Sequence, residues 1–284
     1  MLLKISLSNI KFGNLMPSED SLAVKKNVFV LADGITRDPK LPPRFKSNSI
    51  KDILKYYPRP SGAKVVADIC TTSFIEFAKN DLDIKHILCK VNSRIAEYNK
   101  KKIKKVNFLE NDYFGCVAAG GFIINNILHY GYLGDCGIAI INSKGNLRFQ
   151  TKDGMQDFIA FENKYLKTKE FNWSLKTYRQ LIRSKYRNKN KLNNGKLISY
   201  GAFTGEKAAE KFIVTGQKRI QAGEYIIFYS DGFHKILHSK EFLKIITDKN
   251  IGNIKKKIIV LSARFGKEDY EKYGRERSLI IKKV

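Results

Sequence analysis

Three aspartates stand where their side chains could do chemistry, each at the end of an apolar run that reads as a β-strand: Asp33, Asp135 and Asp231. A carboxylate at the mouth of a buried strand costs desolvation free energy unless another group compensates its charge. A bound divalent cation is a common compensator, because hard cations prefer oxygen ligands. The three segments therefore predict a converging metal centre.

The same residues also fit ordinary turns. Asp33 and Asp231 are each followed by glycine, which is a frequent turn signal after a strand, and Asp135 is preceded by one. Each dipeptide alone is compatible with a simple turn. The order and context of the motifs along the chain decide between the two interpretations.

Six short motifs follow one another along the chain. They are Ser18-Glu19-Asp20-Ser21, Asp33-Gly34, the glycine-rich run 115–121, the run 131–135, Phe203-Thr204-Gly205 and Ser230-Asp231-Gly232. In this order they resemble the motifs of the metal-dependent protein phosphatase 2C (PPM) family. The resemblance covers nearly the whole chain, and six motifs in register argue against coincidence.

The resemblance implies a phosphatase that acts on phosphoserine and phosphothreonine in phosphorylated protein substrates. Members of the family use two Mn²⁺ or Mg²⁺ ions and a bridging metal-bound hydroxide that attacks phosphorus directly. Asp33 and Asp231 are the implied catalytic residues. No phosphoenzyme intermediate is expected.

The matching motifs also imply a ligand set. Asp33 would bridge both ions, the carbonyl of Gly34 would bind one ion, and Asp231 would hold the other. A side chain at position 34 would crowd the approach of that carbonyl to the metal, which is a physical reason for glycine there. Glu19 would act through ordered water molecules, and Asp20 would orient the neighbouring turn.

Asp135 matches a Gly-Asp turn whose carboxylate can hold a weaker third ion in the family. The further acid expected four residues after Asp231 is Lys235 in this chain. A structural role in the turn and a metal-binding role are both open for Asp135.

The end of the chain departs from the family pattern. Aligning Ser278 with the Thr or Ser of the final-strand motif puts Arg275 where the last metal-binding aspartate should stand. The adjacent Glu276 or the upstream Asp269 could supply the missing carboxylate. If neither does, one metal loses a strong ligand. The alternative function is then a catalytically reduced pseudophosphatase that acts as a phosphoprotein-binding or regulatory module.

The expected phosphate-binding residue differs as well. Leu15 stands where the family has its phosphate-binding arginine, four residues before Glu19. Arg37 is close enough in sequence to Asp33 to offer a guanidinium that binds phosphate through two hydrogen bonds. The other interpretation of Arg37 is an exposed structural arginine.

These residues need strands to position them and helices to cover those strands. Apolar alternation predicts strands at 2–6, 21–24, 28–32, 212–214, 225–229 and 278–281, with β-rich runs over 113–150. Apolar residues at three- and four-residue spacing predict helices over 66–77 and 84–98, around 173–182, after Asp231 and around 253–264. The resemblance implies an α+β fold, a four-layer αββα sandwich of two antiparallel sheets flanked by helices.

We expect a single domain over residues 1–284, with a flap-like insertion around 152–197 whose basic face could hold a phosphorylated substrate or be a solvated surface. The net charge of +26 allows a nucleic-acid partner but does not favour one, because no nucleic-acid motif accompanies it. No apolar run reaches the roughly 18 residues of a membrane-spanning helix, and the N-terminus does not read as a secretory signal, so a cytoplasmic location is expected. The four cysteines read as buried reduced thiols.

Overall fold

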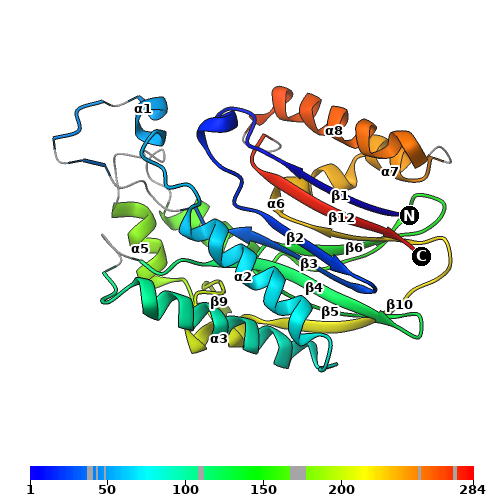
Figure 1. Ribbon diagram of the computed structural model, residues 1–284, viewed down its shortest axis with the longest axis horizontal. Coiled ribbons are helices and arrows are strands. Elements are labelled where there is room, and N and C mark those ends of the chain that lie inside the picture. Colours follow the sequence, from blue (N-terminus) through cyan, green and yellow to red (C-terminus); the bar gives the residue numbers. More distant parts are fainter. Residues whose placement is uncertain are drawn as a thin grey trace.

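Two five-stranded antiparallel sheets, stacked face to face, form the centre of the computed structural model (Figure 1). It describes residues 1–36, 41–42, 44–47, 49–107, 112–166, 177–248, 251–270 and 274–284. The strands of the first sheet are, in order, β1 (Leu2–Leu7), β12 (Arg277–Lys283), β11 (Tyr225–Tyr229), β6 (Gly137–Ile141) and β7 (Leu147–Gln150). The strands of the second sheet are, in order, β10 (Val214–Arg219), β5 (Ile127–Leu133), β4 (Cys116–Ile124), β3 (Val28–Gly34) and β2 (Ser21–Lys25).

Helices cover the outer face of each sheet. The second sheet packs against α2 (Gly62–Phe77) and α3 (Ile84–Lys102), and the first sheet packs against α7 (Lys240–Ile246) and α8 (Ile251–Glu268). Figure 1 shows α2 and α3 on one side of the paired sheets and α7 and α8 on the other. This arrangement confirms the α+β, four-layer αββα architecture expected from the sequence.

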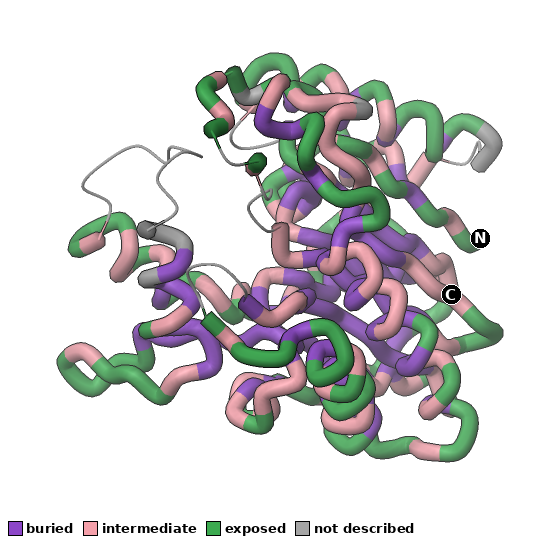
Figure 2. The backbone as a smooth tube through the Cα atoms, turned by 60° about the vertical axis from the view of Figure 1, so that its left-hand side comes forward, coloured by how far each residue is buried: buried purple, intermediate pink, exposed green. Residues whose placement is uncertain are grey.

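Alternation along β3 explains how one strand serves two cores. Phe29 and Leu31 face the first sheet, whereas Val30 and Ala32 face α2 and α3, because successive side chains of a strand point to opposite faces. Between the sheets, Phe29 stacks on Phe228 of β11 with ring centroids 5.7 Å apart. Figure 2 shows these central strands as the most continuously buried part of the molecule.

The remaining elements lie mostly between or after the strands. They are α1 (Ile50–Leu54), α4 (Gln156–Phe161), α5 (Thr177–Lys185), α6 (Asp231–His234), the short β8 (Leu192–Asn193) and β9 (Lys196–Leu197), the π-helical turn η2 (Glu162–Leu166), and the 3₁₀ turns η1 (Gly13–Leu15), η3 (Lys207–Phe212) and η4 (Ile236–His238). None of the described helices is long and apolar enough to cross a bilayer.

Two element boundaries differ from the sequence-based expectation. The strand predicted at 212–214 is β10, which begins at Val214, because Phe212 belongs to η3. β10 is an edge strand whose side chains are mostly exposed, so its apolar pattern is weak. The helix predicted around 173–182 is seen as α5 from Thr177 onward; residues 171–176 lie outside the described part of the chain. Of the four free cysteines, Cys89 on α3 is only half-buried.

Candidate functional site

Asp33 and Asp231 lie where strands of the two sheets end. Asp33 is the penultimate residue of β3 in the second sheet, and Asp231 follows β11 in the first sheet and begins α6. β3 and β11 contact each other across the core between the sheets. Burial, then the charge of Asp20, then the charge of Asp231 raise the pKa of Asp33 well above its ordinary value. The structure therefore brings together the two aspartates singled out by the strand-end pattern.

Asp20, just before β2, belongs to the same group of side chains. Its side chain is buried, with 5% of its surface exposed, and Oδ1 has no hydrogen-bond partner among the described residues. Its other oxygen accepts a hydrogen bond from Ser230 Oγ at 3.2 Å. Burial, then the charge of Glu276, raises the pKa of Asp20 well above its ordinary value. From the sequence we expected Asp20 only to orient the turn, yet its charge acts on Asp33 more strongly than any other does.

Two more acids that follow strands, Asp135 and Asp153, lie near Asp231. Burial, then the charges of Asp231 and Asp153, raise the pKa of Asp135 to about 8. Asp153 follows β7, and Gly154 after it donates a backbone hydrogen bond to the carbonyl of Gly134 at 2.9 Å. The sequence analysis missed Asp153, although an Asp-Gly pair after a strand is the signal that identified Asp33.

Gly34 is required by close packing of backbone. A Cβ added at this position would lie 2.9 Å from the carbonyl oxygens of both Ala63 and Glu19. Contacts this short do not occur for real side chains, so any other residue would push α2 or the segment before β2 away. The structure thus gives a packing reason for this glycine, in addition to the access of a metal to its carbonyl that we proposed from the sequence.

Glu19 is fully engaged by hydroxyl groups. Its carboxylate accepts hydrogen bonds from Tyr57 Oη at 2.6 Å, from Thr36 Oγ1 at 2.7 Å and from Ser61 Oγ at short range. Only 1% of the residue's surface is exposed, and burial is the main cause that raises its pKa. Glu19 therefore ties three segments together beside the strand ends.

Glu276 has its carboxylate turned to the backbone before β2. It accepts hydrogen bonds from the backbone N–H of Glu19 at 2.8 and 2.9 Å and of Asp20 at 2.9 Å, and from the hydroxyl of Ser18 at short range. Its negative charge raises the pKa of Asp20 and Asp33. The other acid considered for the missing family aspartate, Asp269, follows α8, where its N–H donates to the carbonyl of Phe265 at 2.9 Å.

Arg275 faces the acids from a position two residues before β12. Its Nη1 lies 3.9 Å from Oδ2 of Asp231, and the arginine side chain is 58% exposed. The positive charge of Arg275 lowers the pKa of both Asp231 and Asp135, whereas burial, the largest cause in each case, raises both pKa values. The position expected to carry a metal-binding aspartate therefore presents a cation to these acids.

Arg37 lies outside the described residues, but the neighbouring Thr36 is held from two sides. The hydroxyl of Thr36 donates to Glu19, and its carbonyl accepts a hydrogen bond from Nη2 of Arg183 at 2.9 Å. Arg183 comes from α5, in the segment expected to form a flap, and it is buried. This contact places α5 beside the strand ends.

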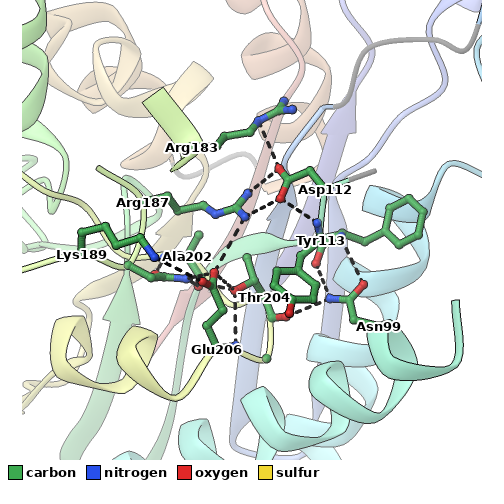
Figure 3. A network of polar contacts seen from close by, with 12 residues as sticks. Asn99, Asp112, Tyr113, Arg183, Arg187, Lys189, Ala202, Thr204 and Glu206 are labelled. Atoms are coloured by element: carbon green, nitrogen blue, oxygen red, sulfur yellow. Dashed lines mark hydrogen bonds and ion pairs between the residues drawn. The ribbon is translucent and has the colours of Figure 1, made fainter. Parts of the chain in front are cut away.

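A buried polar network fixes α5 and the residues after it (Figure 3). Arg187 donates two hydrogen bonds to Asp112, at 2.7 and 2.9 Å, and Nε of Arg183 lies 3.6 Å from the same carboxylate. On the other side, Nη2 of Arg187 lies 3.8 Å from Oε2 of Glu206. The Asp112 and Arg187 side chains are 2% and 1% exposed, so this ion pair is shielded from water.

The four aspartates Asp20, Asp33, Asp135 and Asp231, called here the carboxylate cluster, have the donor chemistry of a site for hard cations. No three His, Cys, Asp or Glu side chains in the described ranges are already arranged as metal ligands. The donors fit such an ion nevertheless. Burial raises the pKa of all four side chains, the charges of other cluster acids add to this for Asp20, Asp33 and Asp135, and the buried Oδ1 of Asp20 lacks a hydrogen bond among the described residues. A divalent cation would relieve both conditions.

The similarity of this chain to known proteins lies in its structure and not in its sequence. No protein-family model and no curated protein sequence matches this chain significantly. The catalytic domain of the serine/threonine protein phosphatase PstP in complex with two manganese ions matches with a TM-score of 0.60 and 14% identity, over 99% of this chain and 96% of that chain. A serine/threonine phosphatase of S. agalactiae matches with a TM-score of 0.64 and 13% identity, over 100% and 99%.

The PPM Ser-Thr phosphatase MsPP of Mycobacterium smegmatis, solved in complex with cacodylate, matches with a TM-score of 0.58 and 10% identity, over 100% of this chain and 98% of that chain. At such identities the likeness describes the fold. Two stacked antiparallel sheets with flanking helices, matched end to end, show that this chain has the fold of the PPM (protein phosphatase 2C) serine/threonine phosphatases.

Proposed function

We propose that this protein is a metal-dependent phosphatase that removes phosphate from phosphoserine and phosphothreonine in proteins. The observation that carries the proposal is the convergence of the carboxylate cluster at the strand ends of a PPM fold. The fold alone is compatible with many functions. Four buried or half-buried carboxylates whose pKa values are all raised, three of them partly by the charges of the others, are the expected signature of a functional site.

The residues that would hold the cations are Asp33, Asp231, Asp20 and the carbonyl of Gly34, with Asp135 at the side. Carboxylate and carbonyl oxygens are ligands that Mn²⁺ and Mg²⁺ accept. The family pattern implies two such ions. When bound, they would lower the pKa of a water molecule and neutralise charge on the phosphoryl oxygens.

The chain's own residues set when the site accepts a cation. With raised pKa values, the cluster carboxylates retain protons at a pH where an exposed aspartate is ionised. A cation binds the ionised form, so its uptake releases protons and becomes stronger as the pH rises. Glu19 and Glu276 hold the segment before β2 in place through their hydrogen bonds, which fixes Asp20 where its charge acts on Asp33.

The substrate is proposed to be a phosphorylated protein, with Arg37 as its phosphate-binding residue. The net charge of +26 favours approach of acidic and phosphorylated partners. An Arg37→Ala variant should raise KM for a phosphopeptide and leave kcat largely unchanged. An unchanged KM would remove Arg37 from the site.

The direct test is Mn²⁺-dependent release of phosphate from a phosphoserine peptide by wild-type protein and by Asp33→Asn. Changes in groups behind metal ligands typically cost 10–100-fold, so loss of a direct ligand should cost on the order of 100-fold or more. The matched control is Asp157→Asn, because the Asp157 side chain is 59% exposed and pairs only with Lys152 among the described contacts. Full activity in Asp33→Asn would refute the assignment.

The second candidate is a pseudophosphatase that binds phosphoproteins without turnover. The observation that favours it is Arg275, which faces Asp231 where the family pattern has an acid. Under this function, a phosphopeptide binds in calorimetry while no phosphate is released at any Mn²⁺ concentration. Release of phosphate that depends on Asp33 decides for the enzyme.

A further inference from the structure

We infer that Arg275 is a resident counter-ion that fills one of the two cation positions of the carboxylate cluster, so that the chain takes up one divalent ion instead of two. The inference rests on the metal-dependent function proposed above for the ion that remains. It concerns the number of ions and the residues that hold them.

The backbone fixes where Arg275 stands. Ser278 of β12 donates its N–H to Ser230 Oγ at 2.8 Å, and Ser230 donates its N–H to the carbonyl of Ser278 at 3.0 Å. This pair of hydrogen bonds ties the start of β12 to the residue that precedes Asp231. Gly232 is packed so closely there that a Cβ would lie 2.5 Å from the Cβ of Arg277 and 2.6 Å from the carbonyl oxygen of Glu276. Arg275 therefore approaches Asp231 because of strand pairing, and its guanidinium lies within 4 Å of that carboxylate.

Arg275 is the arginine whose charge acts on this half of the site. Asp231 and Asp135 both feel the positive charge of Arg275, and both feel the negative charge of Asp153. An arginine stays protonated at any physiological pH, so this counter-ion cannot be removed by titration. A divalent ion on Asp231 would have to displace the guanidinium or sit within a few ångströms of a like charge.

The other half of the site is arranged differently. The largest charge effects here all come from acids: Glu276 and Asp231 act on Asp20, and Asp20, Asp231, Asp135 and Glu276 act on Asp33. Oδ1 of Asp20 is buried and lacks a hydrogen bond among the described residues, so this oxygen is available as a ligand for a cation. The single divalent ion is therefore expected at Asp20 and Asp33, with the Gly34 carbonyl alongside.

The test counts Mn²⁺ ions bound per chain by isothermal titration calorimetry, supported by electron paramagnetic resonance of the loaded protein. Wild-type protein is expected to bind one Mn²⁺ and to give the spectrum of an isolated ion. Arg275→Asp, which restores an acid at this position, is expected to bind two and to give the spectrum of a spin-coupled pair. The matched control is Arg94→Asp, since the Arg94 side chain on α3 is also exposed and lies 3.2 Å from an acid, Glu76 of α2; this variant should still bind one.

Two Mn²⁺ ions on the wild-type chain would overturn the inference, even if the protein hydrolyses phosphopeptides and the proposed function stands. One ion on Arg275→Asp would overturn it as well, because the guanidinium would then not be what excludes the second ion. Absence of Mn²⁺ binding in both proteins would refute the inference together with the metal-dependent function.

Discussion

Removing the guanidinium of Arg187 should destabilise the protein strongly, because the buried carboxylate of Asp112 would lose the ion pair and the two hydrogen bonds that compensate its charge. The two side chains are 1% and 2% exposed and share hydrogen bonds of 2.7 and 2.9 Å. Breaking a buried ion pair by removing one partner costs about 3–5 kcal/mol. Arg183 remains 3.6 Å from Asp112 and offsets part of the uncompensated charge. We therefore expect Arg187→Met to lower the free energy of unfolding by about 3 kcal/mol, at the low end of that range.

Urea unfolding followed by circular dichroism measures this loss as a shift of the midpoint. In a thermal scan the same loss corresponds to about 6 °C, at roughly 2 °C per kcal/mol for a chain of this size. Arg94→Met is the control, because the pair of Arg94 with Glu76 is 43% and 54% exposed and such pairs contribute about 1 kcal/mol or less. Adding Asp112→Asn to Arg187→Met should recover part of the loss, since the unpaired charge disappears. Equal losses for Arg187→Met and Arg94→Met would refute this account of the network.

Three further predictions concern the site. Burial raises the pKa of Asp135 to about 8, so between about pH 4 and pH 8 the folded metal-free protein binds more protons at this residue than the unfolded chain does. The melting temperature measured in EDTA should therefore fall as the pH rises over that range. The Asp135→Asn variant should show a smaller fall. Gly34→Ala should lower the free energy of unfolding, measured in urea, by about 1–3 kcal/mol, since the new methyl group would lie 2.9 Å from two carbonyl oxygens. Unchanged stability would mean that the segment before β2 can shift at little cost. Glu276→Gln should lower the free energy of unfolding by about 1–3 kcal/mol, because one amide oxygen cannot replace two carboxylate oxygens that accept hydrogen bonds from the backbone N–H groups of Glu19 and Asp20. An unchanged urea midpoint would show that these hydrogen bonds do not contribute to stability.

Strand-end acids were predictable from the sequence because each follows an apolar run. Asp33 and Asp231 come after continuous buried runs, Phe29 to Ala32 in β3 and the whole of β11, so the runs before them are conspicuous. Asp153 was missed because β7 is only four residues long and includes the polar Arg148 and Gln150. The layered fold followed from the order of the motifs, while the start of β10 was misplaced, since an exposed edge strand needs few apolar side chains.

The roles of Glu276 and Asp20 could not be read from the sequence. Glu276 was considered as a substitute metal ligand, yet its oxygens accept hydrogen bonds from backbone more than 250 residues away in the chain. Whether a carboxylate turns to backbone N–H groups or to a cation depends on geometry that spacing does not encode. The contact of Arg183 with Thr36 likewise joins residues 147 positions apart.

The carboxylate cluster takes its members from both layers of the sandwich, Asp33 from one sheet and Asp231 from the end of the other, and the stacked pair Phe29 and Phe228 joins the two layers in the core. The affinity of the site for a cation should therefore depend on how the two sheets are aligned. A core substitution such as Phe228→Leu, which removes no ligand, should weaken Mn²⁺ uptake by loosening the packing between the two layers. Binding of the ion should in turn clamp the layers together.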